Sequence, residues 1–275
     1  MLGRDVVARL QAESDRYEVV GLGRSDLDVT DWAACEAALD GFDVVVNCAA
    51  YTAVDDAESH FDEAFDVNAV GPANLARAAS LHGGRLVQLS TDYVFGGNET
   101  EPYAHDHVMR PVSAYGRSKA AGEWAVAAAG AQHIVLRTAW LYGEHGSSFP
   151  RTIARVARER GRVDVVDDQV GQPTWTVDVA DLVVRLVEAA APGGAYAATS
   201  SGQTSWFGFA QRVVEAAAID AEVHPSSSTD SARPAPRPAY SAMSHDSLVA
   251  AGVEPIGPWA DRWAVAAAAI VGETR

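Results

Sequence analysis

The segment Phe42-Asp-Val-Val-Val-Asn-Cys-Ala-Ala50 joins a run of valines to an end of small and polar residues. A short β-branched run of this kind is typical of a strand that is buried on both faces. Helical sequence flanks it, over Asp31–Leu39 before it and over Phe61–Leu81 after it, and Gly71-Pro72 predicts a break in the second helix. We therefore expect a parallel sheet whose crossover connections are helices.

The same alternation of strand and helix continues in both directions along the chain. Further strands are expected at Tyr17–Gly21, Arg85–Ser90 and His133–Arg137. Ser113 has the side chain of an N-cap, so a helix is expected from there to about Gly130. This order predicts an α/β fold: a Rossmann-like doubly wound parallel sheet with helices on both faces.

The later chain is less regular and is expected to form a smaller lobe, and the family resemblance described below implies that this lobe binds the substrate. The helices and strands expected there are Phe149–Arg160, Val163–Val166, Val177–Ala191, Ala195–Ala198, Phe207–Ala218 and Trp259–Val271, and Ser226–Pro238 is expected to be a loop. We assign residues 1–139 to an N-terminally truncated NAD(P)-binding domain. Residues 140–275 are assigned mainly to the substrate lobe, with some segments returning to the sheet.

The first ten residues resemble the middle of a dinucleotide-binding unit. Met1–Leu10 is typical of the helix that follows a Gly-rich turn, and Gly3 stands where the last glycine of that turn is expected. The preceding strand and most of the turn are missing from the sequence, although a central strand satisfies the backbone groups of both neighbours. We therefore expect that Met1 is not the natural start and that roughly ten to fifteen residues precede it.

The composition argues against several classes of protein. A net charge of −16 disfavours nucleic acid or an anionic membrane as a general partner. No apolar run approaches the ~18 residues of a membrane span, and no signal segment opens the chain, so we expect a cytoplasmic protein. Cys35 and Cys48 are too few for a disulfide framework or a zinc quartet, and no metal site is expected.

Lys119 is the only lysine in the chain, and arginine supplies the rest of the 21 basic side chains. It follows Tyr115 by four residues, so both side chains share one face if they lie on a helix. Because a nearby cation favours the phenolate, we expect the pKa of Tyr115 to fall from ~10 towards neutrality, which suits a proton donor. The alternative is a surface Tyr/Lys pair, but the lone lysine and the motifs below favour the catalytic interpretation.

Small and polar residues follow three of the predicted strands, at the edge where open α/β sheets bind ligands. These runs are Val46–Asp55, Ser90–Phe95 and Arg137–Gly143. The hydroxyl of Thr91 is suited to bind a substrate oxygen beside the phenol, although each run alone is also typical of an ordinary strand end. Trp140 is either a flat wall for a sugar ring or a core aromatic residue.

Taken together and in this order, these motifs resemble those of the dTDP-4-dehydrorhamnose reductase family, which belongs to the extended short-chain dehydrogenases/reductases. The resemblance covers nearly the whole chain and includes Asp56-Ala-Glu58, Val67-Asn-Ala69, Thr204-Ser-Trp206 and Arg237-Pro238. The sequence departs from the family pattern at Arg117-Ser118 and in the residues that follow Pro238.

The resemblance implies that Thr91, Tyr115 and Lys119 form the catalytic trio. The residues assigned to the cofactor are Gly3, Arg24, Asp28, Val29, Ala49, Ala50, Tyr51 and Thr52, together with Tyr115 and Lys119. Thr91, Asp92 and Trp140 fall where the family contacts its substrate, and Arg237 is a candidate for the substrate's diphosphate. Arg24 either binds the 2′-phosphate of the cofactor, which favours NADPH, or is an exposed surface arginine, which leaves NADH open.

The implied activity is NAD(P)H-dependent reduction of the 4-keto group of dTDP-4-dehydro-L-rhamnose to dTDP-L-rhamnose. The expected partner is thus a dTDP-linked 4-keto-6-deoxyhexose, and the chain is expected to be a monomer or a homodimer. Two alternatives stay open. One is a reductase or epimerase for another dTDP-linked deoxysugar, and the other is a non-catalytic regulatory or binding subunit of the same fold.

Overall fold

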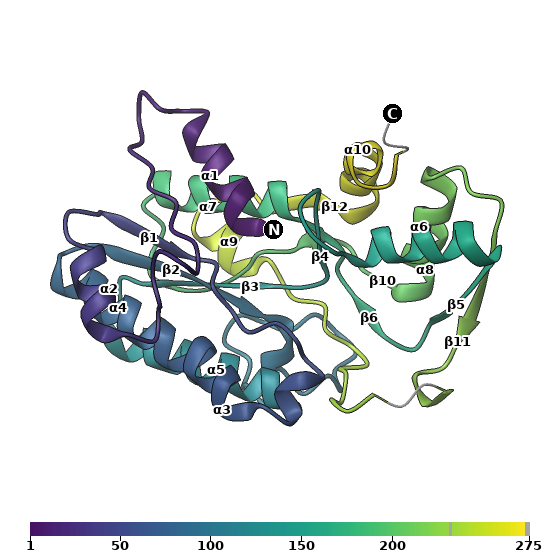
Figure 1. The fold of residues 1–275 in the computed structure, drawn as a ribbon, viewed down its shortest axis with the longest axis horizontal. Coiled ribbons are helices and arrows are strands. Elements are labelled where there is room, and N and C mark those ends of the chain that lie inside the picture. The colour runs from purple at the N-terminus through teal and green to yellow at the C-terminus, as the bar shows by residue number, and fades with distance from the viewer. Residues whose placement is uncertain (231–232, 273–275) are drawn as a thin grey trace.

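The computed structural model describes residues 1–230 and 233–272, which form two lobes side by side (Figure 1). The helices are α1 (Leu2–Gln11), α2 (Trp32–Ala38), α3 (Phe61–Phe65), α4 (Gly71–Leu81), α5 (Ala114–Ala129), α6 (Phe149–Arg160), α7 (Thr176–Glu188), α8 (Trp206–Ala216), α9 (Asp246–Ala250) and α10 (Trp259–Val271). The strands are β1 (Val44–Asn47), β2 (Arg85–Thr91), β3 (Ile134–Thr138), β4 (Leu141–Tyr142), β5 (Arg162–Val166), β6 (Val170–Gly171), β7 (Thr174–Trp175), β8 (Gly194–Ala197), β9 (Ser200–Ser201), β10 (Thr204–Ser205), β11 (Glu222–Ser226) and β12 (Ile256–Pro258). Within the described ranges, no helix is both long enough and apolar enough to cross a membrane.

The first lobe is built on a parallel sheet in the order β1-β2-β3-β8. Alternate residues of β2 face opposite sides of the sheet. Val87 packs in a cluster with α1 and α7, whereas Leu86 packs in another cluster with α2, α4 and α5. Figure 1 shows the sheet lying between these two helical layers. The predicted α/β fold, with a parallel sheet covered on both faces, is therefore confirmed.

The second lobe has a core of its own. Its strands β5 and β11 pair in parallel, and α6, α8 and α10 pack around them over buried residues such as Ile153, Phe209 and Trp263. β8, α7 and α9 come from the later half of the chain but pack in the first lobe. The carboxyl end of β3 leads directly to β4, whose Tyr142 belongs to the second core. The carboxyl edge of the sheet consequently faces the second lobe.

One predicted strand is wrong. Tyr17–Gly21 is irregular chain without a sheet partner, in which Val20 is 53% exposed, and the adjoining Leu22 is 50% exposed. In the described residues β1 pairs with β2 alone, so its other edge has no neighbouring strand. A single extended segment forms no ladder without hydrogen bonds from an adjacent strand, which explains why this sequence is not a strand here.

Most other predicted elements form close to their expected bounds. α6 and α10 have the predicted limits, while α7 ends three residues early. The break at Gly71-Pro72 is confirmed, since a π-helical turn over Asp66–Val70 separates α3 from α4. Ser113 caps α5 by accepting a hydrogen bond from the N–H of Gly116 at 3.1 Å. Two residues of the loop predicted at Ser226–Pro238, 231 and 232, lie outside the described residues.

Two glycines let α5 approach its neighbours closely. A Cβ atom at Gly116 would lie 2.3 Å from the carbonyl oxygen of Tyr93, and one at Gly122 would lie 2.1 Å from that of Asn68. Both obstacles are backbone atoms that cannot rotate away. Glycine at these positions therefore sets how deeply α5 packs against the turn after β2 and against the π-helical turn.

We predict that Gly122→Ala destabilises the fold by about 1–3 kcal/mol, because the added methyl group forces α5 away from Asn68. Gly3→Ala is the matched control, since its Cβ would meet Cys48 at an ordinary 3.5 Å. In a helix without a clash this substitution is neutral or stabilising by up to about 1 kcal/mol. Urea denaturation of both variants measures the two effects. Equal stability of the two variants would contradict the packing described for α5.

Candidate active site

The catalytic trio predicted from the sequence comes together where β2 ends. Thr91 is the last residue of β2, and its hydroxyl accepts the N–H of Tyr93 at 3.2 Å, donates to Oδ1 of Asp92 at 2.9 Å and lies beside the phenol of Tyr115. Tyr115 is buried, and its ring packs edge-on against Tyr93 at 5.6 Å between centroids. Lys119 is one helical turn further along α5, and its Nζ donates to the carbonyl oxygen of Leu89 at 2.6 Å.

The ammonium group of Lys119 is held in a dry environment. The residue is only 4% exposed. Burial lowers its pKa to about 8, against the opposing effects of Glu123 and Cys48. Lys119 is therefore charged at neutral pH, but it loses its proton at a lower pH than an exposed lysine does.

The expected fall in the pKa of Tyr115 is wrong for this structure. Burial raises that pKa to about 12, the hydrogen bond from Thr91 opposes the rise, and the carboxylate of Asp92 adds to it. Lys119 is not among the groups that shift it. The physical reason is that the ammonium of Lys119 points to the carbonyl of Leu89 on the strand. Tyr115 thus keeps its proton throughout the neutral range.

Asp92 is the buried carboxylate of the site. Its Oδ1 accepts the hydroxyl of Thr91 at 2.9 Å, while Oδ2 is buried without a partner within hydrogen-bond geometry. Burial raises the pKa of Asp92 to about 6, against the lowering effect of the hydroxyls of Ser241 and Thr91. A buried oxygen without a partner is costly for the free protein, so this carboxylate is well placed to accept a ligand hydroxyl.

The loop after β1 carries the predicted cofactor residues Ala49, Ala50, Tyr51 and Thr52. Its backbone is fixed by two asparagines. The Oδ1 of Asn47 accepts the N–H of Ala49 at 3.0 Å. Asn68 clamps Tyr51 by accepting its N–H at 2.9 Å and donating to its carbonyl at 3.0 Å. The hydroxyl of Tyr51 also donates to the carboxylate of Asp56.

The start of α1 lies over the end of β1. A Cβ atom at Gly3 would lie 3.5 Å from the Cβ of Cys48, so the helix begins close to the sheet edge. The first N–H groups of a helix lack partners within the helix and carry a partial positive charge. Gly3 is therefore placed where a phosphate group of a dinucleotide would find backbone donors.

The remaining predicted cofactor residues lie in the segment 22–31 beside β1. Arg24 and Asp28 are exposed, and hydrogen bonds from Thr30 lower the pKa of Asp28, with a smaller effect from Arg24. Val29 packs against Gly71 at the start of α4. Arg24 is thus free to pair with a phosphate, and Asp28 stays ionised at neutral pH.

Two predicted substrate residues lie where the lobes meet. Arg237 pairs with Asp55 at 2.9 Å, joining the later loop to the loop after β1. Trp140 stacks face to face on Trp206, with centroids 3.5 Å apart and planes at 7°. A Cβ atom at Gly171 would lie 2.5 Å from the Trp140 ring. The structure thus places Trp140 in an aromatic stack between the lobes, and its contact with a sugar stays a prediction.

Sequence reasoning missed three residues that organise this site. Asn68 fastens the cofactor loop, Asp55 anchors Arg237, and Glu123 forms a buried ion pair with Arg137 at 2.8 Å. Glu123 follows Lys119 by four residues, so the helical spacing was a usable signal. Asn68 and Asp55 lie within the runs Val67-Asn-Ala69 and Val46–Asp55 that the sequence already singled out, but neither run assigns a role to these side chains.

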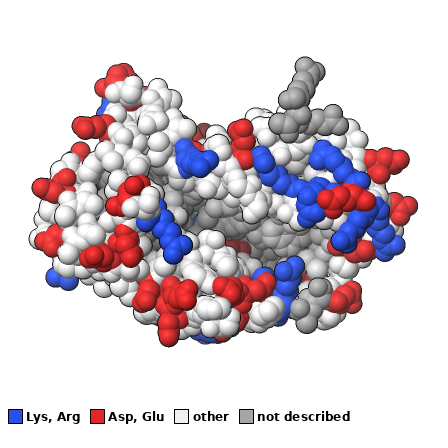
Figure 2. All heavy atoms as spheres, viewed as in Figure 1, with Lys and Arg blue, Asp and Glu red and all other residues white. Residues whose placement is uncertain are grey.

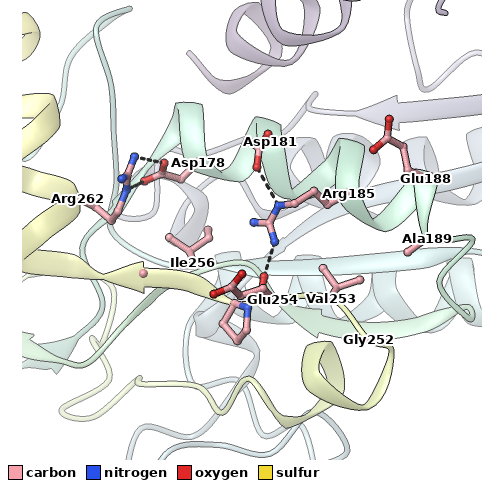
Figure 3. Close-up of a pocket in the computed structure, with 12 residues that line it drawn as sticks. Asp178, Asp181, Arg185, Glu188, Ala189, Gly252, Val253, Glu254, Ile256 and Arg262 are labelled. Carbon is pink, nitrogen blue, oxygen red and sulfur yellow. Dashed lines mark hydrogen bonds and ion pairs between the residues drawn. The ribbon is translucent and has the colours of Figure 1, made fainter.

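The side of the molecule drawn in Figure 2 is hollowed between the two lobes. A separate cavity of about 690 Å³ lies between α7 and the segment 252–257 (Figure 3). None of the predicted site residues lines it, and four of its charged side chains pair with one another, Asp178 with Arg262 at 2.7 Å and Asp181 with Arg185 at 2.8 Å. In the part of the chain that the structure describes, no group of three or more His, Cys, Asp or Glu side chains is arranged to hold a metal ion.

Known proteins are similar to this chain both in sequence and in fold. A probable dTDP-4,6-dihydroxy-2-methyloxan-3-one 4-ketoreductase from Streptomyces antibioticus is 47% identical over 94% of this chain and 88% of its own length. A dTDP-4-dehydrorhamnose reductase from Mycobacterium tuberculosis is 44% identical over 96% of this chain and 89% of its own length. The crystal structure of dTDP-4-dehydrorhamnose reductase from Bacillus anthracis in complex with NADP has a TM-score of 0.89 and 34% identity, covering 93% of this chain and 92% of that one.

The family model described as "RmlD substrate binding domain" matches residues 1–270, which is nearly the whole chain. This match agrees with the motifs around Thr91, Tyr115 and Lys119 that predicted the resemblance. The chain belongs to the RmlD substrate binding domain family, the family of the dTDP-4-dehydrorhamnose reductases.

Proposed function

We propose that the protein uses NADPH to reduce the 4-keto group of a dTDP-linked 4-keto-6-deoxyhexose, with dTDP-4-dehydro-L-rhamnose as the substrate and dTDP-L-rhamnose as the product. The observation that carries the proposal is the juxtaposition of the Thr91 hydroxyl and the buried phenol of Tyr115 at the carboxyl edge of the sheet, one helical turn from the buried ammonium of Lys119. This arrangement provides a proton donor, a residue that orients it and a buried cation. The dTDP-4-dehydrorhamnose reductase with 44% identity supports the choice of substrate.

The residues present fit a dinucleotide cofactor. Gly3 offers the helix N-terminus for the diphosphate, Tyr51 and its neighbours line the loop after β1, and Arg24 is exposed for a 2′-phosphate. Lys119 is proposed to bind the nicotinamide ribose, for which its ammonium has donors left after the bond to Leu89. When bound, NADPH supplies the hydride that reduces C4 of the sugar.

Side chains of the protein supply the proton that the reduced carbonyl oxygen accepts. Tyr115 is protonated at neutral pH, so it can donate its proton to the carbonyl oxygen that becomes the 4-hydroxyl. Thr91 orients this exchange from its position beside the phenol, and the phenolate left behind regains a proton from solvent. The charge of Lys119 stabilises the site when the phenolate forms. Remote contacts to the nucleotide, for which Arg237 is proposed, fix the position of the keto group.

A second candidate is 4-ketoreduction of a different dTDP-linked deoxysugar. It is favoured by the 47% identity to the Streptomyces antibioticus ketoreductase, which covers 94% of this chain. The two candidates share the same chemistry at Tyr115 and differ in the sugar that fits between the lobes.

Oxidation of NADPH in the presence of single dTDP-4-keto sugars tests the proposal. We expect the absorbance of NADPH to fall with dTDP-4-dehydro-L-rhamnose, and dTDP-L-rhamnose to be identified by mass and chromatography. Faster turnover of another dTDP-4-keto sugar would favour the second candidate. Isomerisation without net oxidation of NADPH would indicate an epimerase, and binding without turnover of any of them would indicate a non-catalytic protein.

We predict that Tyr115→Phe lowers kcat by about 10²–10⁴-fold, because only the proton donor is lost, and leaves the affinity for NADPH nearly unchanged. Lys119→Arg is also expected to be severely impaired, since a planar guanidinium does not fit the buried site of a single ammonium. Arg117→Lys on the exposed side of α5 is the matched control and should keep full activity. Turnover like that of the wild type in either site variant would refute these roles.

We predict that Trp140→Ala raises KM for the dTDP sugar more than it weakens NADPH binding, because its ring lies at the junction of the lobes. Trp206→Ala removes the other half of the stack and serves as the comparison. Fluorescence titrations with dTDP and with NADPH measure both affinities. Equal weakening of the two ligands, with a lower melting temperature, would instead identify Trp140 as a core aromatic residue.

We predict a pH-dependent gain in stability for Asp92→Asn, together with weaker binding of the sugar nucleotide. The pKa of Asp92 is raised from 3.8 to about 6 in the folded state, so the wild type loses stability as the pH rises through this window. Two pKa units correspond to about 3 kcal/mol, so the variant should gain this amount relative to the wild type between pH ~4 and ~7.

Urea denaturation at both pH values measures this gain. Asp28→Asn is the control of opposite sign, because hydrogen bonds lower the pKa of Asp28 and its charge stabilises the fold as the pH rises. A difference between Asp92→Asn and the wild type that does not vary with pH would contradict the burial of an ionised Asp92.

A further inference from the structure

Three side chains on one face of α5 contact three consecutive residues of β2. Tyr115, Lys119 and Glu123 follow one another at intervals of four residues, which aligns them along the helix. Tyr115 lies beside the hydroxyl of Thr91, and Lys119 donates to the carbonyl of Leu89 at 2.6 Å. Glu123 accepts the hydroxyl of Ser90, the residue between them. The first two of these side chains are assigned to the reaction, and the third is not.

Glu123 is part of a buried ion pair. It is 5% exposed, and Arg137 of β3 is 6% exposed. The guanidinium donates to Oε2 from both Nε, at 3.1 Å, and Nη2, at 2.8 Å. Its Nη1 donates to the carbonyl of His105 at 2.6 Å, and its central carbon lies 5.0 Å above the ring of Phe95. Both carboxylate oxygens are therefore bonded, and the side chain is fixed in position.

Glu123 is also the charged partner that faces Lys119. Burial disfavours the ammonium, and only Glu123 and Cys48 act against it. Burial raises the pKa of Cys48 to about 12, so this thiol is neutral at physiological pH. Of the other titratable groups on the neighbouring elements, Tyr115 is protonated, Asp92 acts on Tyr115, and Arg137 is paired with Glu123. Arg85 lies at the far end of β2 and Arg117 is exposed on α5, and neither is among the groups that shift the pKa of Lys119.

We propose that Glu123 is a positioning residue of the active site, whose carboxylate keeps Lys119 charged and holds α5 in register on β2. It touches neither substrate nor cofactor and acts through Lys119. The consequence for catalysis rests on the proposed function, whereas the electrostatic coupling between the two residues does not.

The single lysine of this chain provides a direct test. In protein labelled with carbon-13 at the Cε of lysine, Lys119 gives the only lysine signal, and its chemical shift titrates with the ammonium. In Glu123→Gln we expect the titration midpoint of Lys119 to fall by about 1–3 pH units, the shift that loss of a nearby opposite charge produces. Glu123→Asp, which keeps the charge, should restore most of the midpoint.

If Glu123 has only a structural role, the titration midpoint of Lys119 should change in the opposite direction in Glu123→Gln. If loss of Glu123 only loosened the packing, water would reach Lys119 and its midpoint would rise towards the ordinary 10.5. Ser90→Ala is the matched control, since it removes one hydrogen bond to Glu123 but no charge, and its midpoint should not fall. A midpoint in Glu123→Gln that is unchanged or higher overturns the proposal.

If Glu123→Gln does not fold, the double variant Glu123→Leu with Arg137→Met removes both charges and leaves neither unpaired. The same fall in the Lys119 midpoint is expected in the double variant, and an unchanged or higher midpoint there would also overturn the proposal. NADPH affinity gives a second measurement: in Glu123→Gln it should weaken more at pH ~8 than at pH ~6. Failure of the wild type to reduce any dTDP-4-keto sugar would refute the proposed function but would leave the titration result intact.

Discussion

The attachment of α5 to the carboxyl end of β2 is the contact on which the rest of the site depends. Leu89, Ser90 and Thr91 are consecutive: the first two bind Lys119 and Glu123 of α5 through hydrogen bonds, and the hydroxyl of Thr91 lies beside the phenol of Tyr115. The attachment requires that the helix lie very close to its neighbours, which is possible because Gly116 and Gly122 carry no side chain. A shift of α5 by one residue would break all of these contacts together. The geometry of the proton donor is therefore a property of the packed helix rather than of a flexible loop.

The same edge of the sheet joins the two lobes. β3 runs on through Trp140 into β4, and the ring of Trp140 stacks on Trp206 of the second lobe. On the opposite side, the ion pair of Arg237 with Asp55 links the later loop to the loop after β1. Both links involve residues that were predicted to contact substrate. A sugar nucleotide bound between the lobes, as proposed, would therefore contact side chains that already link the two lobes.

Burial governs the electrostatics of the site. It disfavours the charged forms of Tyr115, Lys119 and Asp92 alike, which raises two of the pKa values and lowers the third. The simple expectation that Lys119 would bring the pKa of Tyr115 towards neutrality fails, because the ammonium is bonded to a backbone carbonyl. The proton on Tyr115 is consequently held tightly, and in the proposed reaction Thr91 and the charge on Lys119 would stabilise the phenolate as it forms.

The sequence by itself determined the helices and strands that local patterns define. These patterns are a regular spacing of residues along one element and a typical capping residue at its end. The valine run of β1, the cap at Ser113 and the i, i+4 pair of Tyr115 and Lys119 all reflect local geometry, so their prediction needed no knowledge of distant residues. For the same reason α6 and α10 were predicted with the bounds they have in the structure.

Only the tertiary structure decided what depends on partners far along the chain. Tyr17–Gly21 has the composition of a strand but no neighbour to pair with. The direction of the pKa shift of Tyr115 depended on burial, and the ion pair of Glu123 with Arg137 required β3 to lie beside β2. Trp140 could be assigned to a stack only once Trp206 was found against it. Hydrogen bonds, burial and ion pairs between distant segments are set by packing, and no spacing within one segment contains that information.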